Sequence, residues 1–217
     1  MNNNLKKVVI MGKGKLAIRI ADWFKQNPNY NLNLIVPVIP EPEWTESLSE
    51  WAKKNNIKLL ESGNYQDIIV YSDDKKIDLV FSVFYDKIIK EDFIKKVKQI
   101  LNLHNSPLPR YRGVRPINWA LKNNEKKHGV TIHEITPGID DGPIISQIEY
   151  SIYPNIDEVR DVYNRALEYG WVLFQQTIPI LDKITPQKQD NTNATYYSNK
   201  ESSKLGNRMN FTIEGSK

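Results

Sequence analysis

The chain has 217 residues, which suits one large domain or one domain with a short appendage, and it is long enough to bury a sizeable core. Its formal charge of +4 comes without an arginine-rich stripe interleaved with aromatics, so no nucleic-acid partner is expected. The absence of cysteine excludes disulfides, thiolate catalysis and sulfur-ligated zinc. No apolar run approaches the roughly 18 to 20 residues of a membrane span, and no signal-peptide pattern is present. We therefore expect a cytoplasmic protein without a metal cofactor or a membrane partner.

The first hundred residues alternate between strand and helix patterns. The β-branched run 7–11 predicts a strand, Gly12 a turn, and residues 15–27 a helix with apolar positions at helical spacing. Further strands are predicted at 32–39, 57–61 and 78–85, and further helices at 45–56 and 90–101. The continuous apolar run 78–85 is typical of a strand buried on both faces of a parallel sheet. This alternation predicts an α/β fold, a Rossmann-like, mostly parallel sheet with helices on both faces.

The pattern changes after residue 100. A short strand at 100–104 leads into a polar loop, and later segments predict a brief helix at 115–123, strands at 128–135 and 143–152, and a long helix at 157–181. Residues 193–200 and 209–215 could each supply a short strand. We expect a catalytic domain over residues 1–185 and, over residues 186–217, an extension that forms a short β-hairpin.

The first turn, Gly-Lys-Gly-Lys-Leu-Ala at residues 12–17, has the Gly-x-Gly-x-x-Ala form of a dinucleotide-binding motif. Its glycines would let the backbone approach phosphate oxygens at the start of a helix. A dinucleotide site also needs an acidic residue at the end of the second strand, and Glu41 comes late and beside prolines. NAD binding is therefore disfavoured, while a phosphate or sugar contact and a purely structural tight turn both stay open.

Residues 102–113, Asn-Leu-His-Asn-Ser-Pro-Leu-Pro-Arg-Tyr-Arg-Gly, place many hydrogen-bonding groups on a rigid loop. Asn102 and His104 alternate at a strand end, so their side chains leave the same face. An amide beside an imidazole suits oxyanion stabilisation and proton transfer, and Asp140, on a glycine-bracketed loop, could orient the imidazole. On spacing alone, a packed histidine and a turn-forming aspartate explain the same residues better than a catalytic pair does.

Together the two segments resemble the signature of the folate-dependent formyltransferases, Asn-x-His-x-Ser-x-Leu-Pro-x-x-x-Gly followed by Asp-x-Gly. The resemblance covers roughly residues 5 to 185. The residues at the fixed positions are Asn102, His104, Ser106, Leu108, Pro109, Gly113, Asp140 and Gly142. Ser106 has no adjacent candidate base and is interpreted as a turn residue.

The resemblance implies a mechanism and a donor site. An amine would attack the formyl carbon of N10-formyltetrahydrofolate while Asn102 and protonated His104 hold the tetrahedral oxyanion. Asp140, selected over Asp141 by the Asp-x-Gly register, would favour protonated His104 and help to remove the amine proton. The pterin would lie against the backbone of two loops, whose residues are Phe84, Tyr85, Asp86, Ile88, Ile89, Thr136, Gly138 and Ile139.

The formyl acceptor differs within this family. Methionyl-tRNA formyltransferases carry a C-terminal barrel of about a hundred residues, which a chain ending at residue 217 would not hold. Phosphoribosylglycinamide formyltransferases have an Asn-Gly-Ser-Asn-like phosphate loop where this chain has Lys13, Gly14 and Lys15. Segments 84–89 and 111–123 instead look like the N-formyltransferases that act on nucleotide-linked amino sugars. The acceptor expected first is dTDP-4-amino-4,6-dideoxyglucose, used for O-antigen and other surface glycans.

A dTDP-sugar needs cations for its diphosphate and an aromatic face for its base. The candidate substrate-binding residues are Gly12, Lys13, Lys87, Arg112, Trp119, Tyr196 and Tyr197, with solvated charge and ordinary packing as the alternatives. In the resembling enzymes the C-terminal segment takes part in a dimer, so a homodimer is expected. A phosphoribosylglycinamide formyltransferase, a folate-deformylating hydrolase and a non-catalytic nucleotide-sugar-binding module stay open as alternatives.

Overall fold

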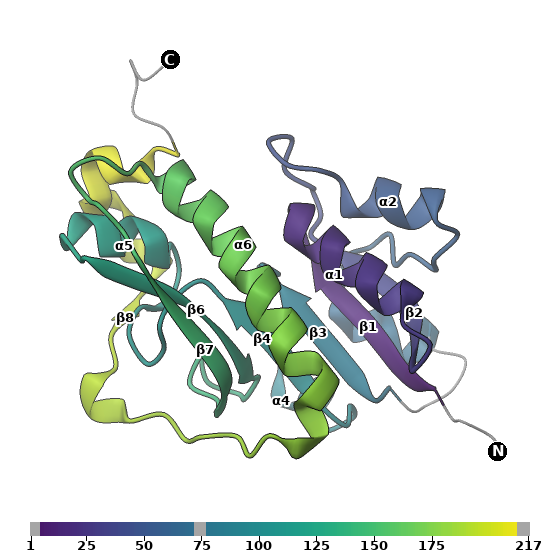
Figure 1. The fold of residues 1–217 in the computed structure, drawn as a ribbon. Coiled ribbons are helices and arrows are strands. Elements are labelled where there is room, and N and C mark those ends of the chain that lie inside the picture. The colour runs from purple at the N-terminus through teal and green to yellow at the C-terminus, as the bar shows by residue number, and fades with distance from the viewer. Residues whose placement is uncertain (1–4, 72–76, 212–217) are drawn as a thin grey trace. The chain divides into compact units, whose positions relative to one another are not determined.

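The structure is a computed structural model that describes residues 5–71 and 77–211 (Figure 1). The chain divides into two compact units. The first contains the chain up to Leu103 together with Glu134–Pro137, and the second contains His104–His133 together with the chain from Gly138 onward.

The first unit is built on a parallel sheet. Its strands are β1 (Lys6–Gly12), β2 (Tyr30–Pro37), β3 (Leu79–Val83) and β4 (Ile100–His104), in the order β2-β1-β3-β4. Every residue of β3 is buried, as the continuous apolar run predicts.

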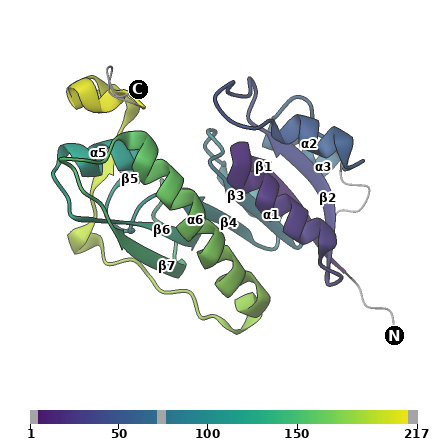
Figure 2. The same ribbon diagram turned by 45° about the horizontal axis from the view of Figure 1, so that its top comes forward.

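Helices cover both faces of this parallel sheet. The helical elements are α1 (Gly14–Gln26), α2 (Leu48–Lys54), η1 (Tyr65–Asp67), α3 (Ile68–Tyr71) and α4 (Glu91–Ile94). On one face Phe24 of α1 packs against Phe81 of β3, with ring centroids 6.5 Å apart. On the other face Val9 of β1 belongs to a core cluster with Ile68 and Phe93. Figures 1 and 2 both show α1 and α2 beside β1 and β2. The α/β fold class predicted from the sequence is confirmed.

Two elements of this unit are shorter than predicted. The helix expected over residues 90–101 ends at Ile94, because the Lys98 N–H donates to the Ile77 carbonyl and the chain there already pairs with its strand neighbour. The strand expected over residues 57–61 is reduced to a single parallel bridge between Ile35 and Leu59. Both predictions were wrong in extent because tertiary hydrogen bonds override local periodicity.

The second unit combines an antiparallel strand pair with helices. Its elements are β5 (Arg112–Gly113), α5 (Pro116–Lys122), β6 (Lys127–Glu134, all but its last residue), β7 (Ile144–Ser151), α6 (Val159–Thr177), η2 (Ile178–Lys183), η3 (Asn191–Asn193), β8 (Tyr196–Tyr197) and η4 (Asn199–Met209). Strands β6 and β7 pair antiparallel, consistent with their period-two sequences. Helix α6 lies against β7, as Figures 1 and 2 both show.

The C-terminal segment differs from the expected hairpin. Its first strand forms as β8, but the partner of β8 is β5, and the two pair in parallel with Arg112 opposite Tyr196. Residues 199–209 form the 3₁₀ element η4, so Met209, the first residue of the second expected strand, is helical. Residues 212–217, which hold most of that strand, lie outside the described residues.

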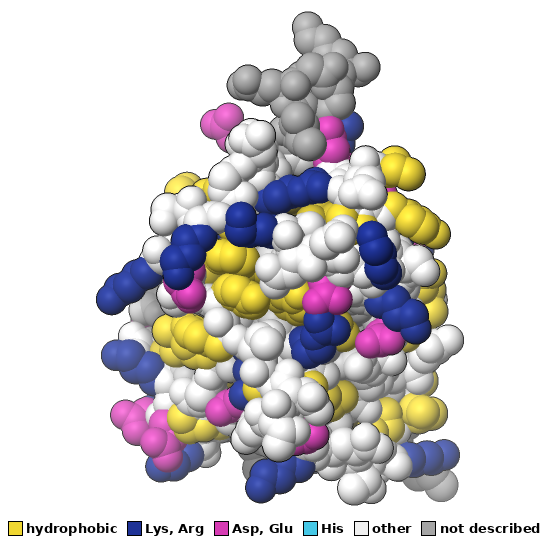
Figure 3. All heavy atoms as spheres, turned by 90° about the vertical axis from the view of Figure 1, so that its left-hand side faces the viewer, with side chains coloured by type: hydrophobic (Ala, Val, Ile, Leu, Met, Phe, Trp, Pro, Cys, Tyr) yellow, Lys and Arg dark blue, Asp and Glu magenta, His cyan; other side chains and the backbone are white. Residues whose placement is uncertain are grey.

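The surface of the second unit carries mixed charge. On the face in Figure 3, Lys and Arg side chains are spread among acidic, polar and apolar ones and form no continuous stripe. Among the described residues, no helix combines the length and the apolar composition needed to cross a membrane.

Candidate functional site

His104, at the end of β4, has acceptors at both ring nitrogens. Its Nε2 lies 3.0 Å from the Tyr111 carbonyl oxygen, and its Nδ1 lies 3.6 Å from Oδ1 of Asp140. A carbonyl oxygen can only accept, so the Nε2 atom carries a proton. The other ring nitrogen lies beside the Asp140 carboxylate. The side chain is 8% exposed, so little water competes with these partners.

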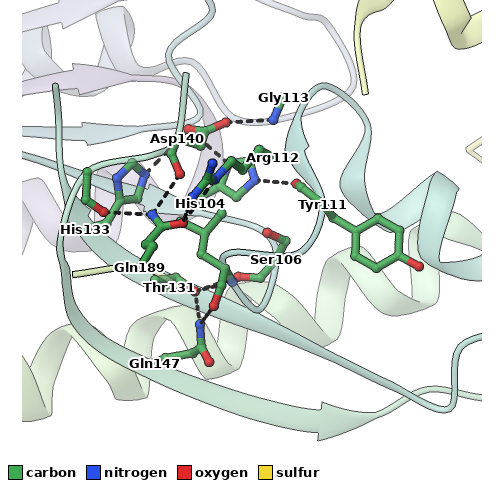
Figure 4. A network of polar contacts seen from close by, with 12 residues as sticks. His104, Ser106, Tyr111, Arg112, Gly113, Thr131, His133, Asp140, Gln147 and Gln189 are labelled. Atoms are coloured by element: carbon green, nitrogen blue, oxygen red, sulfur yellow. Dashed lines mark hydrogen bonds and ion pairs between the residues drawn. The ribbon is translucent and has the colours of Figure 1, made fainter. Parts of the chain in front are cut away.

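Asp140 lies between two imidazoles and a backbone amide (Figure 4). Its Oδ1 atom is 3.6 Å from His104 Nδ1 and 3.5 Å from His133 Nε2, and its Oδ2 atom accepts a 2.8 Å hydrogen bond from the Gly113 N–H. Burial by itself would raise the pKa of this carboxyl group. The charge of His104, the hydrogen bond and charge of His133 and the Gly113 N–H outweigh burial and hold the pKa of Asp140 well below its usual range. The carboxylate is therefore ionised at neutral pH.

Two backbone conformations at this site are unusual for residues with a side chain. Asp140 has φ 51° and Tyr111, whose carbonyl contacts His104, has φ 61°. Residues other than glycine adopt this left-handed region at a cost, and such strain concentrates where function requires a particular geometry. Neighbouring elements therefore have to hold both positions in place.

The rigid loop that follows His104 is fixed through Thr131 of β6. Thr131 Oγ1 donates to the Ser106 carbonyl at 2.6 Å and accepts from the Leu108 N–H at 3.2 Å. Ser106 itself donates to the Arg110 carbonyl at 2.8 Å. The serine is thus held within its turn, in agreement with its interpretation as a turn residue.

Asn102 belongs to the first unit, where it lies half-buried in β4 two residues before His104. Because side chains alternate along a strand, residues two apart such as these lie on the same face of β4. Its role in binding an oxyanion stays a prediction.

The donor loop expected at 84–89 begins at a strained residue, Phe84, with φ 58°. Tyr85 donates from its hydroxyl to the Gly63 carbonyl at 2.7 Å, and burial raises the pKa of Tyr85 to about 12. Lys87 Nζ donates to the same Gly63 carbonyl at 2.8 Å. Of the remaining candidates, Ile89 is buried in the core, whereas Asp86 and Ile88 are exposed.

The second expected donor loop is divided between the units. Thr136 belongs to the first unit, and Gly138, Ile139 and Asp140 belong to the second. The carboxylate of Asp141 lies against Gly138, where a side chain would displace it. Whether either loop binds a pterin stays a prediction.

The candidate phosphate-binding residues have structural partners of their own. Gly12 has φ 147°, and a Cβ there would overlap the Val83 carbonyl, which gives this turn a packing role. Lys13 is the N-cap of α1, and its backbone N–H donates to the same carbonyl. Arg112 donates to the side-chain oxygens of Gln189 and Asn191.

The candidate aromatic residues pack together in the second unit. Trp119, 4% exposed, stacks on Tyr197 with ring centroids 4.2 Å apart, and Tyr197 also stacks on Tyr111 at 5.7 Å. One face of Trp119 is therefore occupied by protein. Tyr196 is 50% exposed, and its ring lies beside Gly113. A contact of any of these rings with a nucleobase stays a prediction.

Sequence reasoning missed two residues of this site, His133 and Gln189. The period-two pattern of β6 offered a signal for the first, because it puts His133 on the same strand face as Thr131. No local pattern marks Gln189, which lies in the polar tail. Within the described chain, no group of His, Asp and Glu is arranged to hold a metal ion.

The lowered pKa of Asp140 predicts a contribution to stability that depends on pH. A carboxyl whose folded-state pKa lies below its unfolded value of about 3.9 stabilises the fold above that pH and loses this effect as the pH falls toward the folded pKa. The free energy of unfolding of the wild type, relative to Asp140→Asn, should therefore decrease on acidification below about pH 4. Urea unfolding of both proteins between pH 3 and pH 7 measures this difference, and a constant or growing difference on acidification contradicts the assignment.

Comparison with known families and proteins gives a consistent result. The model of the family described as formyl transferase matches residues 6–178. The bifunctional polymyxin resistance protein ArnA of Wigglesworthia glossinidia brevipalpis is 36% identical over 140 residues, 63% of this chain and 21% of that protein. A methionyl-tRNA formyltransferase of Caldicellulosiruptor saccharolyticus is 30% identical over 202 residues, 87% of this chain and 64% of that protein. The chain thus spans less than two thirds of the length of either relative.

Two solved structures share both fold and sequence with the chain. WlaRD, described as a sugar 3N-formyl transferase in the presence of dTDP and 5-N-formyl-THF, aligns with a TM-score of 0.79 and 31% identity over 91% of this chain and 71% of that one. The N-formyltransferase of Helicobacter canadensis, in complex with folinic acid and dTDP-3-aminofucose, aligns with a TM-score of 0.76 and 30% identity over 91% of this chain and 72% of that one.

Proposed function

This chain belongs to the formyl transferase family, and from that membership we propose that it transfers a formyl group from N10-formyltetrahydrofolate to the amino group of a dTDP-linked amino sugar. The observation that carries the proposal is the ionised Asp140 carboxylate beside the imidazole of His104, at the positions of the family signature. In such a pair the buried carboxylate can accept a proton, and the imidazolium beside it can stabilise negative charge on a reacting oxygen.

The chemistry needs only groups that this chain supplies. The amine nitrogen of the sugar attacks the formyl carbon, a C–N bond forms, and the carbonyl oxygen becomes an oxyanion. Asn102 donates a hydrogen bond to that oxygen, and protonated His104 stabilises its negative charge as a neighbouring cation. Asp140 takes the amine proton, directly or through water. The oxyanion then reforms the carbonyl, the bond from the carbon to N10 breaks, and N10 takes up the proton that Asp140 received from the amine, directly or through water.

The distribution of protons around His104 supports this assignment of roles. The Tyr111 carbonyl requires a proton on Nε2, and Nδ1 lies beside the Asp140 carboxylate. The proposed mechanism uses the ring in its protonated form, the form that stabilises an oxyanion best. His133 on the same carboxylate oxygen adds a second group that holds Asp140 in its ionised form.

The sugar acceptor is the finer part of the proposal. The sequence favours a 4-amino sugar, dTDP-4-amino-4,6-dideoxyglucose. Of the two related structures, one is described as a sugar 3N-formyl transferase and the other as a complex with dTDP-3-aminofucose, which point to a 3-amino sugar. Lys13 and Lys87 are the cations proposed for the diphosphate, and Tyr196 is the exposed ring proposed for the base. The donor would lie against the backbone of residues 84–89 and 136–140, and the protein would act as a homodimer.

A direct assay tests this function. Purified protein is incubated with N10-formyltetrahydrofolate and, in parallel, with dTDP-4-amino and dTDP-3-amino sugars, a UDP-4-amino sugar, phosphoribosylglycinamide and methionyl-tRNA. We expect one of the dTDP-sugars to gain the mass of one formyl group while the folate loses it. A reaction without acceptor identifies a hydrolase. Formylation of phosphoribosylglycinamide or methionyl-tRNA in place of every amino sugar, or binding of dTDP-sugar without transfer, overturns the proposal.

A further inference from the structure

The segment formed by residues 187–197 contacts both loops that carry the partners of His104 and Asp140. Gln187 exchanges two backbone hydrogen bonds with Ile144, at 2.7 and 2.8 Å, just after the Asp140 loop. Thr195 donates from its N–H to the Pro109 carbonyl at 3.2 Å and accepts from the Arg112 N–H at 2.9 Å. All of these residues belong to the second unit, and the segment lies beyond residue 178, where the family match ends.

Gln189 makes the contact of this segment that lies nearest to Asp140. Its side chain is 6% exposed, and its Nε2 donates to the carbonyl oxygens of Asp140 at 2.9 Å and of Gly142 at 2.7 Å. Both N–H groups of the amide therefore have an acceptor, and the two acceptors are the carbonyls of the residues before and after Asp141. The contact fixes the backbone of a residue whose φ of 51° is costly and would otherwise relax.

Arg112 determines which way the Gln189 amide points. Its Nε and Nη2 atoms donate to Gln189 Oε1 at 3.1 and 2.6 Å, and Nη2 also donates to Asn191 Oδ1 at 2.8 Å. A guanidinium group has donors only, so the amide must turn its oxygen toward Arg112 and its N–H groups toward the Asp140 loop. Figure 4 shows Gln189 lying between Arg112 and the Asp140 loop.

We propose that Gln189 is a positioning residue for Asp140: its amide, oriented by Arg112, holds the loop 138–142 so that the carboxylate stays beside His104 and His133. Gln189 acts through the backbone of the loop, at the carbonyls of Asp140 and Gly142. The consequence for turnover rests on the proposed function, but the position of the carboxylate is a property of the folded protein without substrate. Arg112 thereby has a role in the loop, and its contact with a substrate diphosphate stays a prediction.

Kinetics of three variants test the effect on turnover. Gln189→Ala removes both donors and should lower kcat by about 10- to 100-fold with little change in KM, the scale of a misplaced catalytic group. Gln189→Glu keeps an acceptor for Arg112 but turns an oxygen toward two carbonyls, so it should be impaired as well. A residue that merely anchored Arg112 would leave Gln189→Glu active. The matched control is Gln187→Ala, an exposed glutamine that bonds through its backbone, and it should retain normal turnover.

A spectroscopic measurement tests the positioning without reference to activity. The chain has three histidines, and two of them face Asp140. In nitrogen-15 NMR spectra of the imidazoles, Gln189→Ala and Gln189→Glu should shift the His104 and His133 resonances and leave His128 unchanged, and Gln187→Ala should leave all three unchanged. If neither Gln189 variant shifts His104 and His133, the proposal is overturned. If the variants shift the His104 and His133 resonances but the wild type transfers no formyl group, the positioning role is supported and the proposed function is contradicted. If Gln189→Ala does not fold, Gln189→Glu alone provides the test.

Discussion

Asp140→Asn is expected to lower kcat/KM for formyl transfer by at least about 10²-fold, the loss that follows removal of a proton acceptor or an electrostatic partner of the reacting centre. Asparagine keeps the size of the side chain and tolerates the left-handed backbone at φ 51°, so the fold should persist. What disappears is the negative charge beside His104, and with it the proposed acceptor for the amine proton.

Asp141→Asn is the matched control for this variant, because it removes the neighbouring carboxylate, which lies exposed outside the imidazole pair. Its kcat/KM should stay within a few-fold of the wild type. Steady-state kinetics with the accepted sugar measure both variants, and circular dichroism checks that both are folded. Near-normal turnover of Asp140→Asn, or a greater loss in Asp141→Asn, contradicts the choice of Asp140 from the Asp-x-Gly register.

His104→Ala is expected to have an effect of the same size, at least about 10²-fold in kcat/KM, because it removes the cation that faces the oxyanion in the proposed reaction. The loss should appear in kcat, since the charge on the oxygen develops only in the transition state. Steady-state kinetics over a range of sugar and folate concentrations separate kcat from KM.

His133→Gln provides the comparison for the second imidazole on the same carboxylate. His133 contacts Asp140 Oδ1 at 3.5 Å but has no part in holding the oxyanion, so the variant should lose less activity than His104→Ala. Equal losses in both variants would mean that the two imidazoles act together on Asp140. Retention of near-normal turnover by His104→Ala would remove the histidine from the site altogether.

Local sequence patterns were sufficient for the main elements and for the residues of the signature. The apolar run of β3 and the alternation of β6 and β7 are properties of consecutive residues, and they predicted a strand buried on both faces and two further strands that the structure contains. His104 and Asp140 were likewise selected by short motifs. The distances from Asp140 to His104 and to Gly113 are consistent with that selection.

The errors occurred where hydrogen bonds from distant segments replace local ones. Helix α4 ends early because Lys98 and Gln99 already form backbone hydrogen bonds with Ile77 and with Val80 of β3. Strand β8 was expected to pair within the C-terminal tail, but its partner β5 precedes it by more than eighty residues. Periodicity describes which residues are apolar and how they are spaced, and it contains no information about such partners.

The sequence by itself determined the α/β class, the order of the main strands and helices and the formyl transferase signature, and it predicted the choice of Asp140 over its neighbour, since each depends on residues close together in the chain. Only the tertiary structure decided that His133 shares the carboxylate with His104, that Trp119 stacks on Tyr197, and that Arg112 orients Gln189 on the Asp140 loop. The physical reason is that each of these contacts joins segments far apart in the sequence, and their geometry follows from how the chain packs rather than from any local propensity.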